Sequence, residues 1–450
     1  MKGMTPATVT KVCGGKFVGD PAVLDREISF VTRDSREAGE GCLFAAIPGE
    51  RVDGHDYLES CRQSGALCAI CQRDPGYTEL PYILVDNTQT ALGALSAWYR
   101  RRFDIPVIGV TGSVGKTSAK EMMASVLSQR FNTLKTQGNY NNELGVPLTL
   151  LSLRQEHEAA VVEMGISDFG EMERLTAMVR PTAAVITTVG FSHLEKLGDL
   201  DGVLKAKTAV TEGMDKNSLL LINGDDQKLR GYAAPIKTLS YGLEPHNDIR
   251  AENVRALGLD GMELDIRFGE RRLHARIRAF GDHLVYAALA GAAAGFMLGL
   301  TDEEISQGIN GYESVGRRSR AVDTGRCVVI DDCYNSNPNS LASALRSLAL
   351  LPGRKVCVLG DMLELGKDSP ALHRRVGELA AKTVQLVITH GEMAKYMYES
   401  AAATGNALHF DEKQALLDAL PGLIAPGDCV LVKASRGMRF EDVSEKLMSL

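Results

Sequence analysis

The segment that most constrains the fold is residues 105–131, where an apolar run, a glycine-containing loop and an amphipathic stretch follow one another. The loop reads GVTGSVGKTS. A strand, a loop ending in Gly-Lys-Thr and a helix, in that order, form a phosphate-binding loop at the edge of a parallel sheet. The usual motif has its first glycine where this chain has Val110, and Gly109 gives the spacing GxxGxxGKT instead. The order of the elements still predicts a nucleotide site.

The residues of this loop have distinct expected tasks. Gly112 and Gly115 let the backbone approach a phosphate closely, and the N–H groups of the following helix face that phosphate. Lys116 reaches the terminal phosphates, and Thr117 offers its hydroxyl to Mg²⁺. The predicted nucleotide contacts in the loop are Gly112, Ser113, Gly115, Lys116, Thr117 and Ser118.

The length, charge and cysteine content exclude several classes of protein. The 450-residue chain has a net charge of −7 and no Lys/Arg tract, so it lacks the electrostatic footprint of a nucleic-acid binder. No run approaches the about 20 apolar residues that span a bilayer, and no signal peptide is evident. Nine scattered cysteines fit reduced thiols, and Cys68 and Cys71 point to opposite faces of an expected strand, which argues against zinc. We therefore expect a multidomain, cytoplasmic α/β protein.

Three α/β blocks follow from the hydrophobic pattern. Residues 1–100 carry short β-like runs and end in a helix-like segment. Residues 101–314 continue from the loop with apolar runs between helical segments, which is typical of a doubly wound parallel sheet, and residues 241–280 alternate like antiparallel strands. Residues 315–450 repeat strand-then-loop units with polar residues just after each strand, where open α/β sheets bind ligands.

Two further polar residues follow apolar runs of the central block. Glu163 ends the run VVE, and His193 follows the next run along the chain. Taken singly, Glu163 could be a solvated strand-end acid and His193 a structural hydrogen-bonding group. Together, beside a phosphate-binding loop, a carboxylate and a histidine at two strand ends favour a metal site.

The combination of motifs resembles one family. The segments that carry the resemblance occur in the family's order through all three blocks, and they are GVTGSVGKTSAKEM, NYNNELGVPLTLL, VVEMGIS, FSHLEKLG, KAKTAVTEGM, DDCYNSNP and GDMLELG. They are similar to those of the Mur ligases of bacterial cell-wall synthesis. The resemblance implies three domains: residues 1–100 bind a UDP-linked substrate, residues 101–314 form the central ATP-binding domain, and residues 315–450 form a Rossmann-like domain for dipeptide and nucleotide. It also implies a monomer with hinges near residues 100 and 315.

The resemblance implies a reaction as well. Mur ligases use ATP to phosphorylate a substrate carboxylate, and an incoming amine then attacks the acyl phosphate to give an amide. The motifs DDCYNSNP and GDMLELG resemble the branch that adds D-alanyl-D-alanine to UDP-MurNAc-tripeptide, and the Asp-Asn-Pro-Arg loop of the diaminopimelate- or lysine-adding branch is absent. Two alternatives stay open: a sister or folylpolyglutamate-type ligase that adds a single amino acid, and a non-catalytic nucleotide-binding protein that has kept the scaffold.

The family's site residues transfer to this chain by motif. The resemblance implies two Mg²⁺ sites, one held by Thr117 and Glu163 and the other by His193 and Lys207. Lys207 matches the family lysine that carries a CO₂-derived carbamate, and Lys205 is the competing assignment; composition alone would make Lys207 an ordinary surface lysine of a helix. Arg317 matches an arginine that reaches the ATP phosphates, although a solvated pair with Arg318 is the plainer reading. The residues expected to act in catalysis are Lys116, Glu163, His193, Lys207 and Arg317.

The remaining expected contacts lie in the first and third blocks. Asp332 matches the carboxylate that holds the ribose, and Asn335 and Asn337 are either nucleotide contacts or turn formers. Lys433, Ser435 and Arg436 are expected to face the carboxylate of the dipeptide, because an arginine fork matches that group. The expected contacts to the UDP-linked substrate are Ser35, Arg36, Asp53 and His55, for which local turns and caps are the alternative.

One stretch departs from the family pattern. Mur ligases usually carry an Asn pair near the adenine, where this chain has Leu284 and Ala287. Adenine recognition is therefore expected to rely on other groups. Asn142, with its neighbours Asn139 and Asn141, is the candidate for that task.

Overall fold

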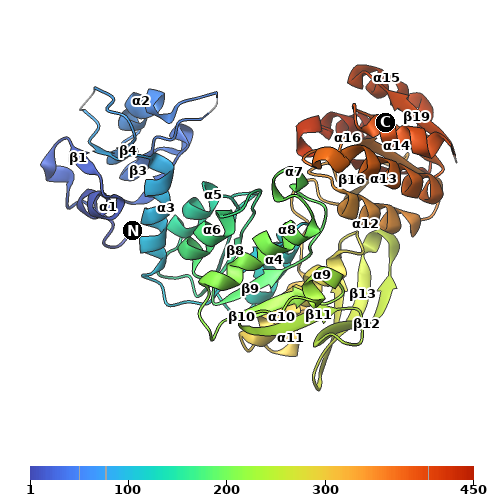
Figure 1. The fold of residues 1–450 in the computed structure, drawn as a ribbon, viewed down its shortest axis with the longest axis horizontal. Coiled ribbons are helices and arrows are strands. Elements are labelled where there is room, and N and C mark those ends of the chain that lie inside the picture. The colour runs from blue at the N-terminus through green and yellow to red at the C-terminus, as the bar shows by residue number, and fades with distance from the viewer. Residues whose placement is uncertain (50, 77–78, 404) are drawn as a thin grey trace.

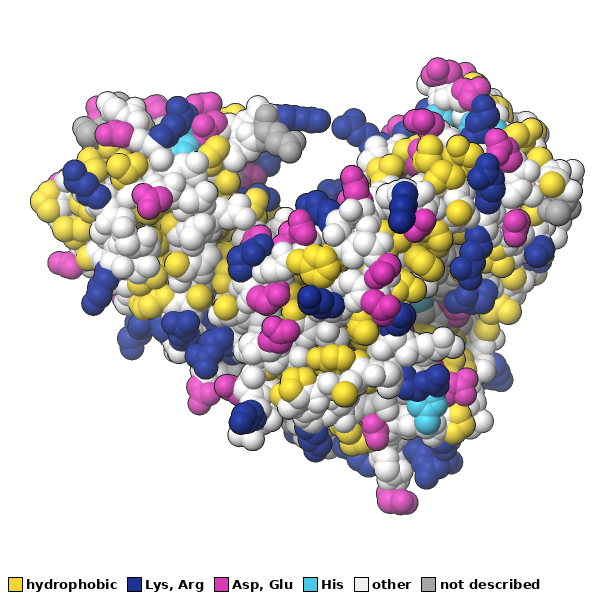
Figure 2. Space-filling view, viewed as in Figure 1, with side chains coloured by type: hydrophobic (Ala, Val, Ile, Leu, Met, Phe, Trp, Pro, Cys, Tyr) yellow, Lys and Arg dark blue, Asp and Glu magenta, His cyan; other side chains and the backbone are white. Residues whose placement is uncertain are grey.

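The computed structural model describes residues 1–49, 51–76, 79–403 and 405–450. The chain forms three α/β units, each built on its own sheet. In Figure 1 the first unit (blue) and the third (orange to red) stand at opposite ends of the second (green to yellow), which gives the molecule an open V shape. Figure 2 shows a wide hollow between the first and third units, with Lys and Arg side chains at its rim.

The first unit is a five-stranded sheet in the order β1-β5-β4-β3-β2, parallel except for β1. Every residue of β3 and β4, two of the three inner strands, is buried, as expected for short apolar runs inside a parallel sheet. Its strands are β1 Lys16–Val18, β2 Phe30–Thr32, β3 Cys42–Ala45, β4 Cys68–Cys71 and β5 Tyr82–Leu84. Its helices are α1 Pro6–Cys13, α2 Leu58–Gln63 and α3 Thr88–Arg100.

The second unit holds a nine-stranded sheet in the order β14-β13-β12-β11-β10-β9-β6-β8-β7. The strands from β12 to β7 are parallel, and β13 and β14 extend the sheet as antiparallel strands, so both parts of the sequence prediction are confirmed. The strands are β6 Val107–Thr111, β7 Thr133–Lys135, β8 Ala159–Glu163, β9 Ala183–Ile186, β10 Leu219–Asn223, β11 Lys237–Gly242, β12 Ile249–Ala256, β13 Met262–Phe268 and β14 Arg271–Ile277.

Helices cover both faces of this sheet. Alternate residues of its central strands therefore enter two separate hydrophobic cores, one on each face. Val107 packs in one core, whereas Ile108 and Val110 pack in the other beneath α4 and α10. The helices of this unit are α4 Lys116–Leu127, α5 Gly145–Leu151, α6 Glu171–Val179, α7 Leu194–Leu197, α8 Leu200–Thr208, α9 Gln227–Arg230, α10 Leu284–Met297 and α11 Asp302–Asn310.

The unusual glycine spacing has a packing cause. Gly109 lies inside β6 and not in the loop, and a Cβ there would meet the Met164 Sδ at 2.8 Å and Pro181 Cβ at 3.5 Å. Val110 is a fully buried strand residue. Gly109 therefore serves the contact between β6 and its neighbours, and the phosphate-binding loop itself begins at Gly112.

The third unit is a six-stranded sheet in the order β15-β16-β20-β17-β18-β19, parallel except for β15. Its strands are β15 Arg320–Asp323, β16 Val328–Asp331, β17 Lys355–Gly360, β18 Leu386–His390, β19 Ala407–Phe410 and β20 Cys429–Lys433. Its helices are α12 Pro338–Ala349, α13 Ser369–Thr383, α14 Ala394–Ala402, α15 Lys413–Leu423 and α16 Glu441–Met448.

Helix α3 attaches the first unit to the second. The Tyr99 hydroxyl donates to the Leu153 carbonyl (3.0 Å), and the buried Arg100 guanidinium donates to the carbonyls of Val179 (3.0 Å) and Phe103 (2.7 Å). A buried arginine with only carbonyl acceptors is sensitive to any shift of those carbonyls. In the part of the chain that the structure describes, no helix is long and apolar enough to cross a membrane.

Candidate active site

The phosphate-binding loop joins β6 to α4 and is fixed by the residues that follow β9. Ser113 N–H donates to the Thr188 carbonyl (2.9 Å), and Val114 N–H donates to the Thr188 hydroxyl (3.1 Å). Gly112 has φ 142°, and a Cβ there would lie 1.9 Å from the Thr187 Oγ1. Only glycine fits this position. Gly115, at φ 85°, is the N-cap of α4.

A cavity of about 540 Å³ opens in front of this loop, and it lies between the second and third units. Its volume is in the range of ordinary ligand pockets. The predicted residues that line it are Ser113, Gly115, Lys116, Thr117, Ser118, Asn142, Glu163, His193, Asp332, Asn335, Asn337 and Lys433. The Lys116 ammonium donates to the Gly112 carbonyl (2.6 Å), and burial lowers its pKa.

The Glu163 carboxylate is brought to the loop by the pairing of β6 with β8. The Thr117 hydroxyl donates to its Oε2 (2.9 Å), and the Asn141 amide donates to its Oε1 (2.8 Å). Glu163 is almost fully buried. The structure thus places Thr117 and Glu163 together, as the sequence predicts. It adds Asn141, which the sequence indicated only as a possible adenine contact.

A buried lysine beneath the loop was not predicted. Lys120 is fully buried, and its Nζ donates to the Thr136 carbonyl (2.7 Å). The same atom lies 2.7 Å from the Glu121 Oε1 and 4.0 Å from the Glu163 Oε2. Lys135 pairs with the other oxygen of Glu121 at 2.5 Å. The loop helix therefore carries its own internal charge network. In the sequence, this network is indicated by the adjacent Lys120 and Glu121, which lie on the side of the amphipathic helix that is otherwise apolar.

His193 follows β9 and lies at the cavity wall with φ 53°, in the left-handed region. Its Nδ1 is 2.6 Å from the Oε2 of Glu364, which belongs to the third unit. The hydrogen bond with His193 lowers the pKa of Glu364. The sequence did not single out Glu364, although this residue lies in the GDMLELG motif.

Lys207 lies in α8 and is 1% exposed, so the surface position expected from composition is wrong. Burial lowers its pKa well below 10.5, and the nearby charge of Lys116 adds to this. Among the residues that the structure describes, none accepts a hydrogen bond from its ammonium nitrogen. Lys205, by contrast, lies over the Phe169 ring with its Nζ 5.8 Å from the centroid. The two candidate lysines therefore differ sharply in environment.

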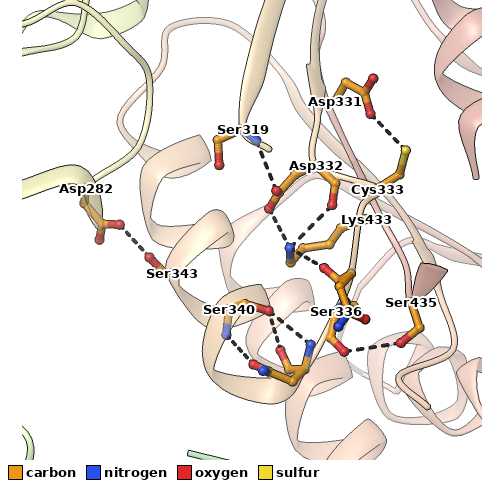
Figure 3. Close-up of polar contacts among 12 residues, drawn as sticks. Asp282, Ser319, Asp331, Asp332, Cys333, Ser336, Ser340, Ser343, Lys433 and Ser435 are labelled. Carbon is orange, nitrogen blue, oxygen red and sulfur yellow. Dashed lines mark hydrogen bonds and ion pairs between the residues drawn. The ribbon is translucent and has the colours of Figure 1, made fainter. Parts of the chain in front are cut away.

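In the third unit, the loops after β16 and β20 meet (Figure 3). The Lys433 ammonium donates to the Asp332 Oδ2 (2.5 Å) and to the Asn335 carbonyl (3.0 Å), and Ser319 N–H donates to the other Asp332 oxygen (3.0 Å). Asn337 caps α12 in a reciprocal pair with Ser340, so the turn-forming alternative accounts for its side chain. The Lys433 ammonium group is thus bound by groups of its own unit.

Three predicted residues of this unit do not line the cavity. Ser435 Oγ donates to the Ser336 carbonyl (3.3 Å), and the Arg436 guanidinium lies 5.5 Å from the centroid of the Tyr334 ring. Arg317 is paired with Asp331 (3.0 Å) and Glu445 (2.7 Å).

The arginine that does line the cavity is Arg318, whose guanidinium carbon lies 3.8 Å from the centroid of the Tyr334 ring. Arg317 and Arg318 are adjacent, and sequence alone does not distinguish which one faces the cavity. The role of Arg317 stays a prediction.

The predicted residues of the first unit lie away from this cavity. Arg36 is paired with Asp34, which caps the short helix that begins at Ser35. Asp53 caps the next short helix and holds the Nδ1 of His55 at 2.6 Å. His55 is buried, and its Nε2 accepts a hydrogen bond from a backbone N–H of the neighbouring strand end (3.1 Å). These contacts match the local turns and caps given as the alternative, and the substrate role of the four residues stays a prediction.

The stretch without the Asn pair is part of the core. Leu284 and Ala287 are buried in α10 against α4. The residue of this stretch that lines the cavity is His283, whose pKa is lowered by burial. Asn139, Asn141 and Asn142 all line the cavity, and the Asn142 Oδ1 also accepts hydrogen bonds from the backbone N–H groups of Leu144 and Gly145 at the start of α5.

A phosphate-binding loop follows β6 of a doubly wound sheet, and a carboxylate and a histidine follow the two strands that flank it, β8 and β9. This arrangement, with the third unit over the site, defines a P-loop nucleotide-binding protein. The particular family follows from three models that match in order along the chain: the Mur ligase family catalytic domain over residues 27–100, the Mur ligase middle domain over 110–295 and the Mur ligase glutamate ligase domain over 317–436. The chain belongs to the Mur ligase family.

Several relatives match along nearly their whole length. The UDP-N-acetylmuramoyl-tripeptide–D-alanyl-D-alanine ligase of Escherichia coli (strain K12) is 35% identical over 455 residues and covers 99% of both chains. That of Bacillus subtilis (strain 168) is 34% identical, covering 96% of this chain and 95% of the relative.

Two solved structures are also similar. A crystal structure of MurF from Acinetobacter baumannii superimposes with a TM-score of 0.91 at 30% identity and 99% coverage of both chains. MurF from Thermotoga maritima, in complex with ADP, gives 0.83 at 26% identity, covering 93% of this chain and 97% of the other. The three-domain Mur ligase fold predicted from the sequence is confirmed.

Proposed function

We propose that this protein is an ATP-dependent ligase that joins D-alanyl-D-alanine to UDP-MurNAc-tripeptide through an amide bond, in the cytoplasmic stage of peptidoglycan synthesis. Two observations together support this proposal. Relatives named for that reaction match the chain over 99% of its length, and Lys116, Thr117 and Glu163 converge on one cavity between the second and third units.

The donor set at the loop fits Mg²⁺. The Thr117 hydroxyl and the Glu163 carboxylate lie 2.9 Å apart at the cavity wall, and Mg²⁺ prefers such hard oxygen ligands. We assign Thr117 and Glu163 to one Mg²⁺ and His193 and Lys207 to a second. Bound Mg²⁺ would neutralise phosphate charge during transfer. Asn141 orients the Glu163 carboxylate through its second oxygen.

Lys207 is suited to carry a carbamate. Because burial lowers its pKa, its amine is neutral more readily than that of a surface lysine. The Nζ lone pair forms a bond to the carbon of CO₂, one C–O π pair moves onto oxygen, and the nitrogen releases a proton to water. The product is an anionic oxygen donor in place of a buried cation. This change relieves the repulsion between Lys207 and Lys116.

The chain's residues divide the reaction between them. Lys116 and the N–H groups at the start of α4 hold the β- and γ-phosphates of ATP while the tripeptide carboxylate attacks the γ-phosphorus and ADP departs. The neutral amine of D-alanyl-D-alanine then attacks the acyl carbon. The tetrahedral species loses a proton from its nitrogen to water and expels phosphate, which leaves the amide. Phosphorylation is needed because a carboxylate does not react with an amine until its oxygen can leave. Positioning of the reactants and stabilisation of charge supply most of the rate acceleration.

The other assignments follow the three units. We assign residues 1–100 to the UDP-linked substrate, with Ser35, Arg36, Asp53 and His55 as contacts; residues 101–314 to ATP; and residues 315–450 to dipeptide and nucleotide. Asp332 and Asn335 face the nucleoside, with Arg317 or its neighbour Arg318 at the phosphates. Ser435 and Arg436 face the dipeptide carboxylate. We expect a monomer.

The test is phosphate release from ATP and Mg²⁺ with UDP-MurNAc-tripeptide, with and without D-alanyl-D-alanine, followed by mass analysis. We expect release only when all components are present, and a product heavier by the dipeptide less water. Turnover with a single amino acid instead would move the protein to a sister ligase. Nucleotide binding without any turnover would favour the non-catalytic alternative, and the Lys116→Ala variant serves as the background control.

A further inference from the structure

One contact joins the metal-site histidine to the third unit. The Nδ1 of His193 lies 2.6 Å from the Oε2 of Glu364. His193 follows β9 and lines the cavity, whereas Glu364 follows β17 in the GDMLELG segment. The two residues are 171 positions apart, so their contact exists only when the second and third units face each other as they do here.

Both residues have an unusual backbone conformation. His193 has φ 53° and Glu364 has φ 64°, in the left-handed region that side chains other than glycine rarely adopt. Only six of the described non-glycine residues have positive φ, and two of those six face each other in this pair. Such conformations persist where the surroundings hold them, and they cluster at functional sites.

The surroundings do hold both segments. Phe191 N–H donates to the Asn339 side-chain oxygen of α12 (3.1 Å), which ties the His193 segment to the third unit. On the other side, Met362 N–H donates to the buried His373 Nε2 (3.0 Å) and Leu363 N–H donates to the Ser435 hydroxyl (2.9 Å). Glu364 is therefore presented from a segment that is fixed to its own unit just before the contact.

Other histidine–carboxylate pairs in the described chain lack this arrangement. Those of His55, His274 and His409 each join groups within a single unit, and none of these three histidines lines the cavity. The His193 pair alone, among those that the structure describes, joins two units at the cavity wall.

We propose that Glu364 is a positioning residue for His193, and this proposal rests on the proposed function. A carboxylate at Nδ1 keeps the proton on that nitrogen, so Nε2 keeps its lone pair free for a metal. Because Glu364 comes from the third unit, closure of that unit sets the tautomer of His193. Docking of the third unit onto the second therefore also completes the metal site, because it brings Glu364 to His193.

The direct test reads the tautomer and not the activity. Protein with ¹⁵N-labelled histidine is studied by NMR at pH 8 as wild type, Glu364→Ala, Glu364→Gln and Glu195→Gln. In wild type we expect His193 to be protonated at Nδ1. Glu364→Ala loses this preference, and Glu364→Gln keeps it because the amide oxygen still accepts the proton. Glu195→Gln, an equal change at an exposed acid two residues from His193, leaves the signal unchanged.

Kinetics supply the second reading. In Glu364→Ala we expect the Mg²⁺ concentration at half-maximal rate to rise, or kcat to fall, by about 10- to 100-fold, with the KM for UDP-MurNAc-tripeptide unchanged. Glu364→Gln stays within about threefold of wild type. Melting curves establish that each variant is folded, and Glu364→Gln keeps the test valid if the alanine variant is not.

Two results overturn the proposal. One is a His193 tautomer that is the same in wild type and Glu364→Ala, and the other is a Glu364→Gln variant that loses the Nδ1 proton. The NMR result stands whether or not the enzyme turns over the expected substrates, so its failure is distinct from failure of the proposed function.

Discussion

Lys120 gives the sharpest test of the internal charge network beneath the phosphate-binding loop. Its side chain is fully buried, and its Nζ contacts the Glu121 carboxylate and the Thr136 carbonyl, each at 2.7 Å. The change is Lys120→Met, which keeps a long unbranched side chain and removes the charge and its hydrogen bonds. It leaves the Thr136 carbonyl without this donor and takes one of the two cations from Glu121.

The size of the effect follows from burial. Removing one partner of a buried ion pair costs about 3–5 kcal/mol, and the lower value applies here because Glu121 keeps Lys135 at 2.5 Å. In a unit of about 200 residues each kcal/mol lowers the melting temperature by about 2–4 °C. We therefore expect Lys120→Met to lower the melting temperature of the central unit by about 6–12 °C.

Scanning calorimetry of wild type, Lys120→Met and Lys135→Met measures this. Lys135 binds the same carboxylate but its side chain is 38% exposed, so the matched variant loses at most about 1 kcal/mol. A Lys120→Met transition within 2 °C of wild type contradicts the reasoning. So does a Lys135→Met variant that falls as far as Lys120→Met, because burial would then not set the cost.

Four further predictions concern the site and the third unit. Lys116→Ala is expected to lose about a hundredfold or more in kcat/KM with an unchanged melting curve, measured by phosphate release; activity near wild type would refute the loop assignment. Lys207→Ala is expected to lose activity that added short carboxylic acids partly restore, whereas an unaffected variant would reject the carbamate. Gly112→Ala is expected to abolish ADP binding in calorimetry, because the new Cβ would lie 1.9 Å from the Thr187 hydroxyl; wild-type affinity would exclude this geometry. Burial lowers the pKa of His373, so its contribution to stability is present above about pH 6.5 and is lost as the pH falls toward the lower folded value; calorimetry from pH 7 to 5 is expected to show a steeper decline in wild type than in His373→Gln, and parallel curves would refute it.

The sequence predicted the parts of the site that are contiguous or lie at strand ends. The loop from Gly112 to Ser118 is a continuous motif, so its geometry follows from its neighbours in the chain. Glu163 was found because a polar residue at the end of an apolar strand lies at the ligand edge of a parallel sheet. The sheet of the second unit, including its antiparallel extension, was also predicted, since each strand is a short apolar or alternating run bounded by turns.

The parts that were missed depend on contacts between distant segments. Asn141 reaches Glu163 across 22 residues, and no local pattern distinguishes this pairing from adenine binding. Lys207 was assigned to the metal site through the resemblance, and only its burial was not foreseen from composition. It lies four residues after Val203 and one after Ala206, on the buried face of α8. Arg317 and Arg318 are adjacent, and only the fold decides which one faces the cavity.

The two amines near the loop have a consequence for the protein in a cell. Lys207 is buried and Lys116 is half-buried at the cavity wall, and the charge of Lys116 disfavours the charged form of Lys207. An anion that binds the folded chain and not the unfolded one adds its binding free energy to folding, which is about 2.7 kcal/mol at a hundredfold excess over its Kd. We therefore expect nucleotide supply and protein lifetime to be linked: when ATP and ADP run low, the population of unfolded molecules that are open to proteolysis should rise.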